Sequence, residues 1–243
     1  MRKSPLIHLL SLFCLASPVL YADQTPERFE KEVTETLALD YLLSFPDDYD
    51  ADATRRWPLV IFLHGAGERG SDLSKVAVHG PPKRVAEGTD FPFILASPQC
   101  PENEWWTGQP VLELIDSLEE KHRVDSSRIY LTGLSMGGYG TWHFACEAPD
   151  RFAAIAPVCG GGVPYKMRWI KTLPVWAFHG EADHVVPLEE SGRLVDTLKR
   201  LGNETVKFTI YPETGHDSWT PTYNNPELYS WLLSHQREES SAN

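Results

Sequence analysis

Basic residues are scarce in this 243-residue sequence, which holds 22 lysine and arginine residues against 34 aspartate and glutamate residues. The formal net charge is -12 at pH 7, and no stretch gathers the positive charge that a nucleic-acid backbone attracts. An acidic protein of this kind is a poor candidate for nucleic-acid binding. We therefore expect no nucleic-acid partner.

Motifs for cofactors and metals are missing as well. The glycine-rich stretch at residues 64–70 does not end in the Gly-Lys-Ser/Thr sequence that cradles phosphates, so no nucleotide site is expected. The nine histidines include no His-Glu-x-x-His pattern, and the four cysteines include no Cys-x-x-Cys pair. The sequence thus predicts no cofactor and no metal ion.

Apolar runs long enough to span a membrane are also lacking. The run at residues 6–20 is about 15 residues long, whereas a membrane-spanning helix needs roughly 20. It follows the basic pair Arg2 and Lys3 and ends near the small residue Ala22, which is the layout of a signal peptide. We expect residues 1–22 to be a signal peptide, with an uncleaved anchor as the alternative. The mature protein is then expected to be secreted or periplasmic, without a membrane span.

No low-complexity linker divides residues 23–243, so one domain with one large core is expected. Short apolar runs rich in β-formers alternate there with helical patterns. We expect strands at 32–44 (one or two edge strands), 58–63, 91–97, 129–132, 152–158, 175–179 and 206–211, and helices at 73–78, 83–87, 111–122, from 139, 188–201 and 226–233. This alternation predicts an α/β fold with a mostly parallel sheet and helices on both faces. Ligands of such sheets bind beyond the carboxyl ends of the strands.

The most informative stretch is residues 129–140, IYLTGLSMGGYG. It predicts a strand, a tight turn and a helix, with Ser135 at the apex. Gly133 and Gly137 lie two residues to either side, and their missing side chains permit a sharp turn that exposes the hydroxyl. We therefore interpret Ser135 as a nucleophile.

A serine nucleophile needs a base within hydrogen-bond reach. His216 follows the last expected strand in the sequence YPETGHD, where a glycine lets the ring turn inward, and we expect it to be the base. His64 and His179 each precede a glycine at a strand end. We expect these two side chains to bond to backbone and shape their turns.

The base in turn needs an acid to orient it, and the loop after the strand at residues 175–179 offers two. Asp183 is preferred, because its place before the sequence HVVP suits a turn that points the carboxylate toward the histidine. Glu181 and Asp217 are the alternatives. The order Ser, Asp, His along the chain differs from the chymotrypsin and subtilisin orders.

A tetrahedral intermediate also needs two donors for its oxyanion. The backbone N–H of Met136 follows the nucleophile at the start of a helix, where unpaired N–H groups favour negative charge. The second donor is expected from the loop after the strand at residues 58–63, from Ala66 with Gly67 beside it.

Together these motifs resemble those of secreted esterases of the α/β-hydrolase superfamily, of the predicted peptidase or phospholipase/carboxylesterase type, near polyhydroxybutyrate depolymerase-like and feruloyl esterase-like enzymes. The resemblance covers about residues 59–233, through LHGAGERGSD, SPQCPENEWW, IYLTGLSMGGYGTW, WAFHGEADHVVP and YPETGHDSWTP. It maps the family's triad onto Ser135, Asp183 and His216. It implies an α/β-hydrolase fold. No inserted segment of any length is evident between the expected strands, so no large lid domain is expected.

The resemblance also implies a serine carboxylic ester hydrolase that works through an acyl-enzyme. Its substrate would be a small-molecule or polymer-linked ester with a short-chain or aromatic acyl group. A serine peptidase on the same triad and a non-catalytic binding protein of the same fold are the alternatives.

Tryptophans and cysteines complete the candidate residues. Trp105, Trp106 and Trp219 follow expected strand ends, where they are expected to line a wall for acyl groups or sugars, while Trp142 is expected to pack in the core. The cysteines expected in the mature protein are Cys100, Cys146 and Cys159. Cys146 is predicted to be buried, and a Cys100–Cys159 disulfide is one pairing that an oxidising compartment permits.

Overall fold

The computed structural model describes residues 27–34 and 36–237. The expected signal peptide at residues 1–22 lies outside this part of the chain. The chain divides into a short unit that ends at Thr36 and a large unit that begins at Leu37. Residues 27–34 and 36 have no regular secondary structure. The helices and strands described below all belong to the large unit.

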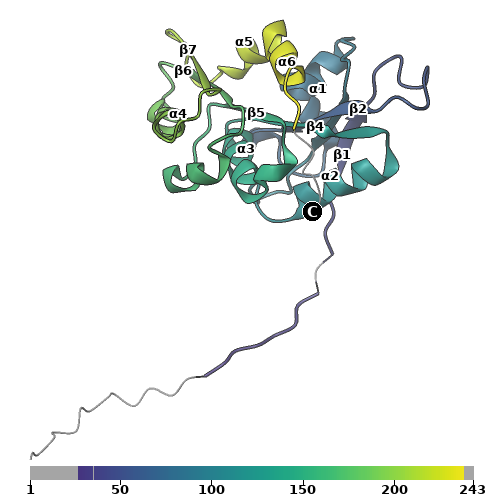
Figure 1. The fold of residues 1–243 in the computed structure, drawn as a ribbon, viewed down its shortest axis with the longest axis horizontal. Coiled ribbons are helices and arrows are strands. Elements are labelled where there is room, and N and C mark those ends of the chain that lie inside the picture. The colour runs from purple at the N-terminus through teal and green to yellow at the C-terminus, as the bar shows by residue number, and fades with distance from the viewer. Residues whose placement is uncertain (1–26, 35, 238–243) are drawn as a thin grey trace, which may run out of the picture. The chain divides into compact units, whose positions relative to one another are not determined.

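Seven strands form one sheet in the order β1-β3-β2-β4-β5-β6-β7 (Figure 1). β1 pairs antiparallel with β3, and the other neighbours are parallel. The strands are β1 (Tyr41–Ser44), β2 (Trp57–Leu63), β3 (Ile94–Pro98), β4 (Val124–Leu134), β5 (Ala154–Val158), β6 (Trp176–Gly180) and β7 (Lys207–Tyr211). The expected mostly parallel sheet is confirmed.

The described chain has six α-helices and four short 3-10 helices, of which α5 and α6 follow the last strand. The α-helices are α1 (Gly80–Ala86), α2 (Pro110–Lys121), α3 (Met136–Glu147), α4 (Glu189–Arg200), α5 (Trp219–Asn224) and α6 (Pro226–Leu233). The 3-10 helices are η1 (Ala66–Glu68), η2 (Leu73–Val78), η3 (Pro149–Arg151) and η4 (Pro164–Ile170). Within the described residues, none of these helices has the length and apolar character of a membrane span.

The core has two halves, one on each face of the sheet. Successive side chains of a strand point to opposite faces. In β2, Leu59, Ile61 and Leu63 therefore join the cluster beneath α2, α3 and α4, while Val60 and Phe62 join the cluster beneath α5 and α6. Figure 1 shows α5 and α6 across the sheet from α2 and α3. The near-continuous apolar run at residues 58–63 thus reflects burial on both faces.

Several elements differ from the sequence-based prediction. Only Tyr41–Ser44 of the expected edge region at residues 32–44 is a strand, because pairing with β3 extends over those four residues alone. The expected helix at residues 73–78 is a 3-10 helix. The short helices α5 and η4 were not predicted, because their few residues carry no clear helical period.

The Cys100–Cys159 disulfide that the sequence permitted is not formed. Cys100, Cys146 and Cys159 are all buried free thiols. Cys100 follows β3 and Cys159 follows β5, and β2 and β4 lie between these strands in the sheet. Three strand spacings of about 4.8 Å place the strands roughly 14 Å apart. A disulfide needs Cα atoms within about 7 Å. Both cysteines lie at the same end of the sheet, but the strands that they follow are too far apart for a disulfide.

Candidate active site

Ser135 sits in a strained turn between β4 and α3. Its backbone has φ 52° and ψ -115°, a left-handed φ that side-chain-bearing residues rarely adopt. The Ser135 N–H donates to the carbonyl of Val158 at 3.0 Å, and the Ser135 carbonyl accepts from the N–H of Tyr139 at 3.0 Å. Strain of this kind costs about 1–3 kcal/mol and persists because the surrounding structure holds it.

The glycines around Ser135 allow close approach of backbones. A Cβ on Gly137 would lie 1.9 Å from the Leu63 carbonyl oxygen, and one on Gly133 would lie 2.5 Å from the Gly137 oxygen. Neither glycine has a positive φ, so the strain lies at the serine itself. The sequence pattern is therefore explained by the packing of α3 against β2 and β4.

A hydrogen-bonded chain joins the three residues predicted as a triad. Ser135 Oγ lies 2.9 Å from Nε2 of His216, and Nδ1 of His216 lies 2.7 Å from Oδ2 of Asp183. The three side chains come from the ends of β4, β7 and β6. The loops after β6 and β7 touch, since a Cβ on Gly180 would lie 2.2 Å from the Gly215 carbonyl oxygen.

Asp183 is held as a carboxylate by several donors. Its Oδ1 accepts the N–H groups of Val185 and Val186, each at 2.9 Å, and its Oδ2 faces His216. Burial raises the pKa of Asp183, but the hydrogen bonds from His216, Val186 and Val185 outweigh burial and lower the pKa overall. Because the carboxylate accepts from Nδ1 of His216, Nε2 of the neutral ring is free to accept from Ser135.

The alternative acids make other contacts. Glu181 accepts the N–H of Glu213 at 3.3 Å, and Asp217 accepts the N–H and hydroxyl of Thr220, each at 3.0 Å. Asp183 is therefore the carboxylate that the fold brings to His216.

His64 and His179 are buried and shape their turns, as expected. Nε2 of His64 accepts the N–H of Cys100 at 2.9 Å, so Nδ1 carries the hydrogen that bonds to the Gly65 carbonyl at 2.6 Å. Burial lowers the pKa of His64 to about 4. His179 lies 2.8 Å from the Val186 carbonyl through Nε2.

The predicted oxyanion donors lie around Ser135. Met136 is the first residue of α3 and Ala66 is the first residue of η1, so neither N–H has an acceptor within its own helix. A Cβ built on Gly65 would lie 3.7 Å from the Ser135 Cβ, which places the loop holding Ala66 and Gly67 next to the serine. Met136 is buried, whereas Ala66 and Gly67 are exposed.

The tryptophans that were predicted to line the substrate site differ in how much of their surface a substrate can reach. Trp219 packs edge-on against His216, with ring centroids 5.2 Å apart, and Trp105 is 56% exposed and packs edge-on against Tyr139. Trp106 is only 4% exposed and donates from Nε1 to the His64 carbonyl at 2.9 Å, so most of its surface is unavailable to a substrate. Trp142 is buried in the core, as expected.

His79 lies close to Trp219 and to Glu68, although the sequence predicted neither His79 nor Glu68 as a site residue. The His79 ring lies 5.3 Å from Trp219, and its Nε2 lies 3.9 Å from Oε1 of Glu68. His79 comes from the connection between β2 and β3, whereas Trp219 lies beyond β7. Only folding brings them together, so no local sequence signal was present.

Cys159, Asp183 and His216 place potential ligand atoms within 4.8 Å of one another, which is close enough for a metal ion. Burial raises the pKa of the Cys159 thiol to about 12, and metals bind the thiolate. The other two residues are engaged with each other and with Ser135. This chemistry suits proton transfer to and from Ser135 better than metal binding.

This chain is similar to several known proteins. Residues 107–224 match the family described as Phospholipase/Carboxylesterase. A bifunctional acetylxylan esterase/xylanase of Neocallimastix patriciarum is 32% identical over 187 residues, which cover 72% of this chain and 26% of that protein. Poly(3-hydroxyalkanoate) depolymerase C of Paucimonas lemoignei is 27% identical over 68% of this chain and 41% of that protein.

A solved structure of a thermostable esterase superposes with a TM-score of 0.73 and 38% identity. The match covers 82% of this chain and 60% of that one. The chain thus spans less than two thirds of the length of each of these relatives.

Proposed function

The chain belongs to the phospholipase/carboxylesterase family of α/β-hydrolases, and on this basis we propose that it hydrolyses carboxylic esters with Ser135 as nucleophile, His216 as base and Asp183 as orienting acid. The observation that carries the proposal is the unbroken chain of hydrogen bonds from Asp183 through His216 to Ser135. A serine hydroxyl becomes an effective nucleophile when such a base removes its proton.

The reaction has two halves. The Ser135 hydroxyl oxygen adds to the ester carbonyl carbon while its proton passes to Nε2 of His216. The bond to the alcohol oxygen then breaks, and His216 gives that oxygen the proton, which leaves an acyl group on Ser135. Water then attacks the carbonyl carbon of the acyl group and gives a proton to His216. The bond to Ser135 Oγ breaks, Ser135 takes that proton from His216, and the acid is released.

Negative charge develops on the former carbonyl oxygen in both halves. We assign its stabilisation to the backbone N–H groups of Met136 and of Ala66, with Gly67 beside it. The α3 dipole adds a favourable field at Met136. Loss of one such donor typically costs about 3–4 kcal/mol in the barrier. Because these donors are backbone groups, side-chain substitutions at the three positions test steric access more than charge.

For the substrate, we propose a short-chain or aromatic acyl group on a small molecule or a polymer. Trp219 packs against His216, and the exposed Trp105 packs against Tyr139 on the helix that follows Ser135, so both rings offer apolar surface to a substrate. We also propose that the mature protein is secreted or periplasmic, on the strength of the signal-peptide layout at residues 1–22.

The experiment is the Ser135→Ala variant assayed on p-nitrophenyl acetate and butyrate. Loss of a triad serine lowers kcat on the order of 10⁶-fold, so turnover should fall to background. Ser230→Ala on α6, an exposed serine far along the chain, is the matched control and should keep full activity. Circular dichroism and the melting temperature should show both variants folded.

Two results would argue against the proposal. Full ester turnover in folded Ser135→Ala would remove Ser135 from the mechanism. A wild-type protein that cleaves peptide anilides but not the p-nitrophenyl esters would be a peptidase on the same triad.

A further inference from the structure

The 3-10 helix η4 carries a charge of the opposite sign to that of the chain as a whole. It lies within residues 151–180, the longest stretch of the sequence without aspartate or glutamate. Lys166 and Arg168 belong to η4, and Lys171 follows its last residue. Three cations are therefore gathered on one short helix of a chain whose formal net charge is -12.

The spacing of residues in η4 separates a buried row from two solvent-facing rows. A 3-10 helix has three residues per turn, so residues three apart lie on the same side. Met167 and Ile170 form the buried row, which fixes the helix to the core. The two remaining rows are exposed or partly exposed. They consist of Tyr165, Arg168 and Lys171, and of Lys166 and Trp169.

Large apolar side chains accompany these cations. Tyr165 is 63% exposed and Trp169 is 48% exposed, and Val163, directly before η4, is 53% exposed. Apolar side chains that are scattered singly over a surface need no explanation, but several together commonly mark an interaction site. The exposed rows of η4 therefore form a candidate interaction surface.

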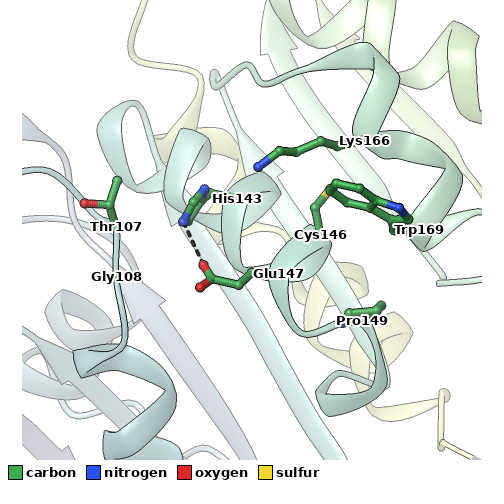
Figure 2. A pocket seen from close by; sticks show the side chains of 8 residues that line it. All are labelled: Thr107, Gly108, His143, Cys146, Glu147, Pro149, Lys166 and Trp169. Carbon is green, nitrogen blue, oxygen red and sulfur yellow. Dashed lines mark ion pairs between the residues drawn. The ribbon is translucent and has the colours of Figure 1, made fainter. Parts of the chain in front are cut away.

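Each solvent-facing row places a cation beside an aromatic ring. The guanidinium carbon of Arg168 lies 3.7 Å from the centre of the Tyr165 ring, and Nζ of Lys166 lies 5.7 Å from the centre of the Trp169 ring. Figure 2 shows Lys166 and Trp169 together at the edge of a hollow against α3. Because charge and apolar surface occupy the same area, a partner must suit both.

Acidic side chains on neighbouring elements have partners of their own. Oε2 of Glu147 on α3 lies 2.9 Å from Nε2 of His143, as Figure 2 shows, and Glu190 on α4 forms an ion pair with Arg193. Asp150 on η3 is exposed and lines a second hollow beside η4. The three cations outnumber this acidic neighbour, so the surface stays positive.

We propose that this surface docks the protein on an anionic phospholipid bilayer, a property that goes beyond ester hydrolysis and does not depend on it. We call it the η4 surface. It consists of Val163, Tyr165, Lys166, Arg168, Trp169 and Lys171. Tryptophan and tyrosine favour the headgroup level of a bilayer, and lysine and arginine are attracted to anionic headgroups while their stems cover apolar surface.

A bilayer suits the η4 surface better than a soluble acidic polymer does. Such a polymer would pair with the cations but leave Val163 and the two rings in water, whereas a bilayer takes up both kinds of side chain. The acidic groups elsewhere on the protein oppose docking only weakly. Their charges are screened over about 8 Å at physiological ionic strength, so the residues nearest the headgroups decide the interaction.

Flotation with lipid vesicles tests the proposal. The chain from Asp23 onward keeps the whole large unit and lacks the apolar run at residues 6–20, which could itself bind lipid. It should float with vesicles made of equal parts phosphatidylglycerol and phosphatidylcholine. Binding to phosphatidylcholine vesicles should be at least about 10-fold weaker, and added salt should weaken binding to the anionic vesicles.

Two triple variants separate the η4 cations from total charge. Replacing the three cations of the η4 surface by glutamine should lower the partition coefficient about 100-fold, at about 5-fold per cation near an anionic surface. Exchanging lysine for arginine and arginine for lysine at those positions keeps the charge and should preserve binding. The matched control removes three exposed lysines from η2, α1 and α2 and should bind like the wild type. These lysines are Lys75, Lys83 and Lys121.

Trp169→Ala tests the apolar part of the surface. Loss of the half-exposed indole should lower the partition coefficient about 10-fold, and Trp169→Phe should recover most of it. Circular dichroism and the melting temperature should show that every variant is folded.

Three outcomes would overturn the proposal. The first is a wild-type protein that does not float with anionic vesicles. The second is an equal loss of binding in the η4 triple variant and in its matched control. The third is binding that depends on the cations but not on Trp169 and is matched by binding to polygalacturonate, which would identify a site for acidic polymers. None of these measurements uses ester turnover, so they stand or fall separately from the proposed function.

Discussion

His64 illustrates how burial decides what a single histidine does. Its ring is fully buried, both nitrogens are occupied by backbone groups, and Trp106 packs edge-on against it at 4.9 Å. His216, in contrast, is only partly buried and faces a carboxylate on one side and a hydroxyl on the other. The two imidazoles are chemically identical, and their neighbours alone make one structural and the other available as a base.

The buried state of His64 predicts a pH-dependent stability. The pKa of His64 is about 4 in the folded protein and 6.5 in the unfolded chain. Between these pH values the imidazole is protonated in the unfolded chain but neutral in the folded protein, so a falling pH favours unfolding. Stability is therefore complete above pH 6.5 and is lost as pH falls toward 4. The loss should be about 3 kcal/mol at 1.4 kcal/mol per pKa unit.

Urea unfolding at pH 7 and pH 4 measures this loss, and His64→Gln is the control. Glutamine does not titrate, and its amide can donate to Gly65 and accept from Cys100 as the imidazole does. The variant should lose about 3 kcal/mol less stability between the two pH values than the wild type. An equal loss in both proteins would show that other groups account for the acid sensitivity.

The helix α3 is the element on which the candidate site depends most. It starts one residue after Ser135 and crosses β2 and β5 so closely that side chains do not fit between them. A Cβ on Gly137 would lie 1.9 Å from the Leu63 carbonyl oxygen, and one on Gly138 would lie 2.3 Å from the Val158 carbonyl oxygen. This close packing therefore fixes the position of the turn that holds the serine.

Alanine at Gly137 should therefore be severely destabilising. The clashing atom is backbone and cannot rotate away, so we expect Gly137→Ala to lower the free energy of unfolding by about 3 kcal/mol or more. Gly192 in α4 has no atom within 4 Å of a built Cβ, and Gly192→Ala should raise stability by about 0.5–1 kcal/mol. Denaturant unfolding of the two variants checks the pair. Similar stability changes in both would contradict the close packing of α3.

At the scale of the whole molecule, the sheet order determines which strand ends meet. β4, β5, β6 and β7 are consecutive neighbours, which brings Ser135, Asp183 and His216 to one end of the sheet. The same order separates Cys100 from Cys159 by two intervening strands. The stability of the large unit must then come from its two-sided core without cross-links among these cysteines.

We therefore expect no disulfide among the three cysteines of the large unit. Denaturation in iodoacetamide without reductant should alkylate Cys100, Cys146 and Cys159 in full, as read by peptide mass spectrometry. The melting temperature should be unchanged by dithiothreitol. A Cys100–Cys159 peptide pair found without reduction would contradict the strand order.

The sequence by itself determined the alternation of strands and helices, because a strand that is buried on both faces needs a continuous apolar run such as residues 58–63. It also pointed to Ser135, Asp183 and His216, because each follows an expected strand, at the edge where ligands of parallel sheets bind, and because their residue types suit a nucleophile, an orienting acid and a base. Those signals are local, and each can be read within about a dozen residues.

Only the tertiary structure decided which distant residues are neighbours. The hydrogen bond of Trp106 to His64, the contact of His79 with Trp219 and the separation of Cys100 from Cys159 all depend on strand order and helix packing. The secondary-structure propensity of a short segment does not predict these contacts, because they form when elements far apart in the chain bury their apolar faces against one sheet.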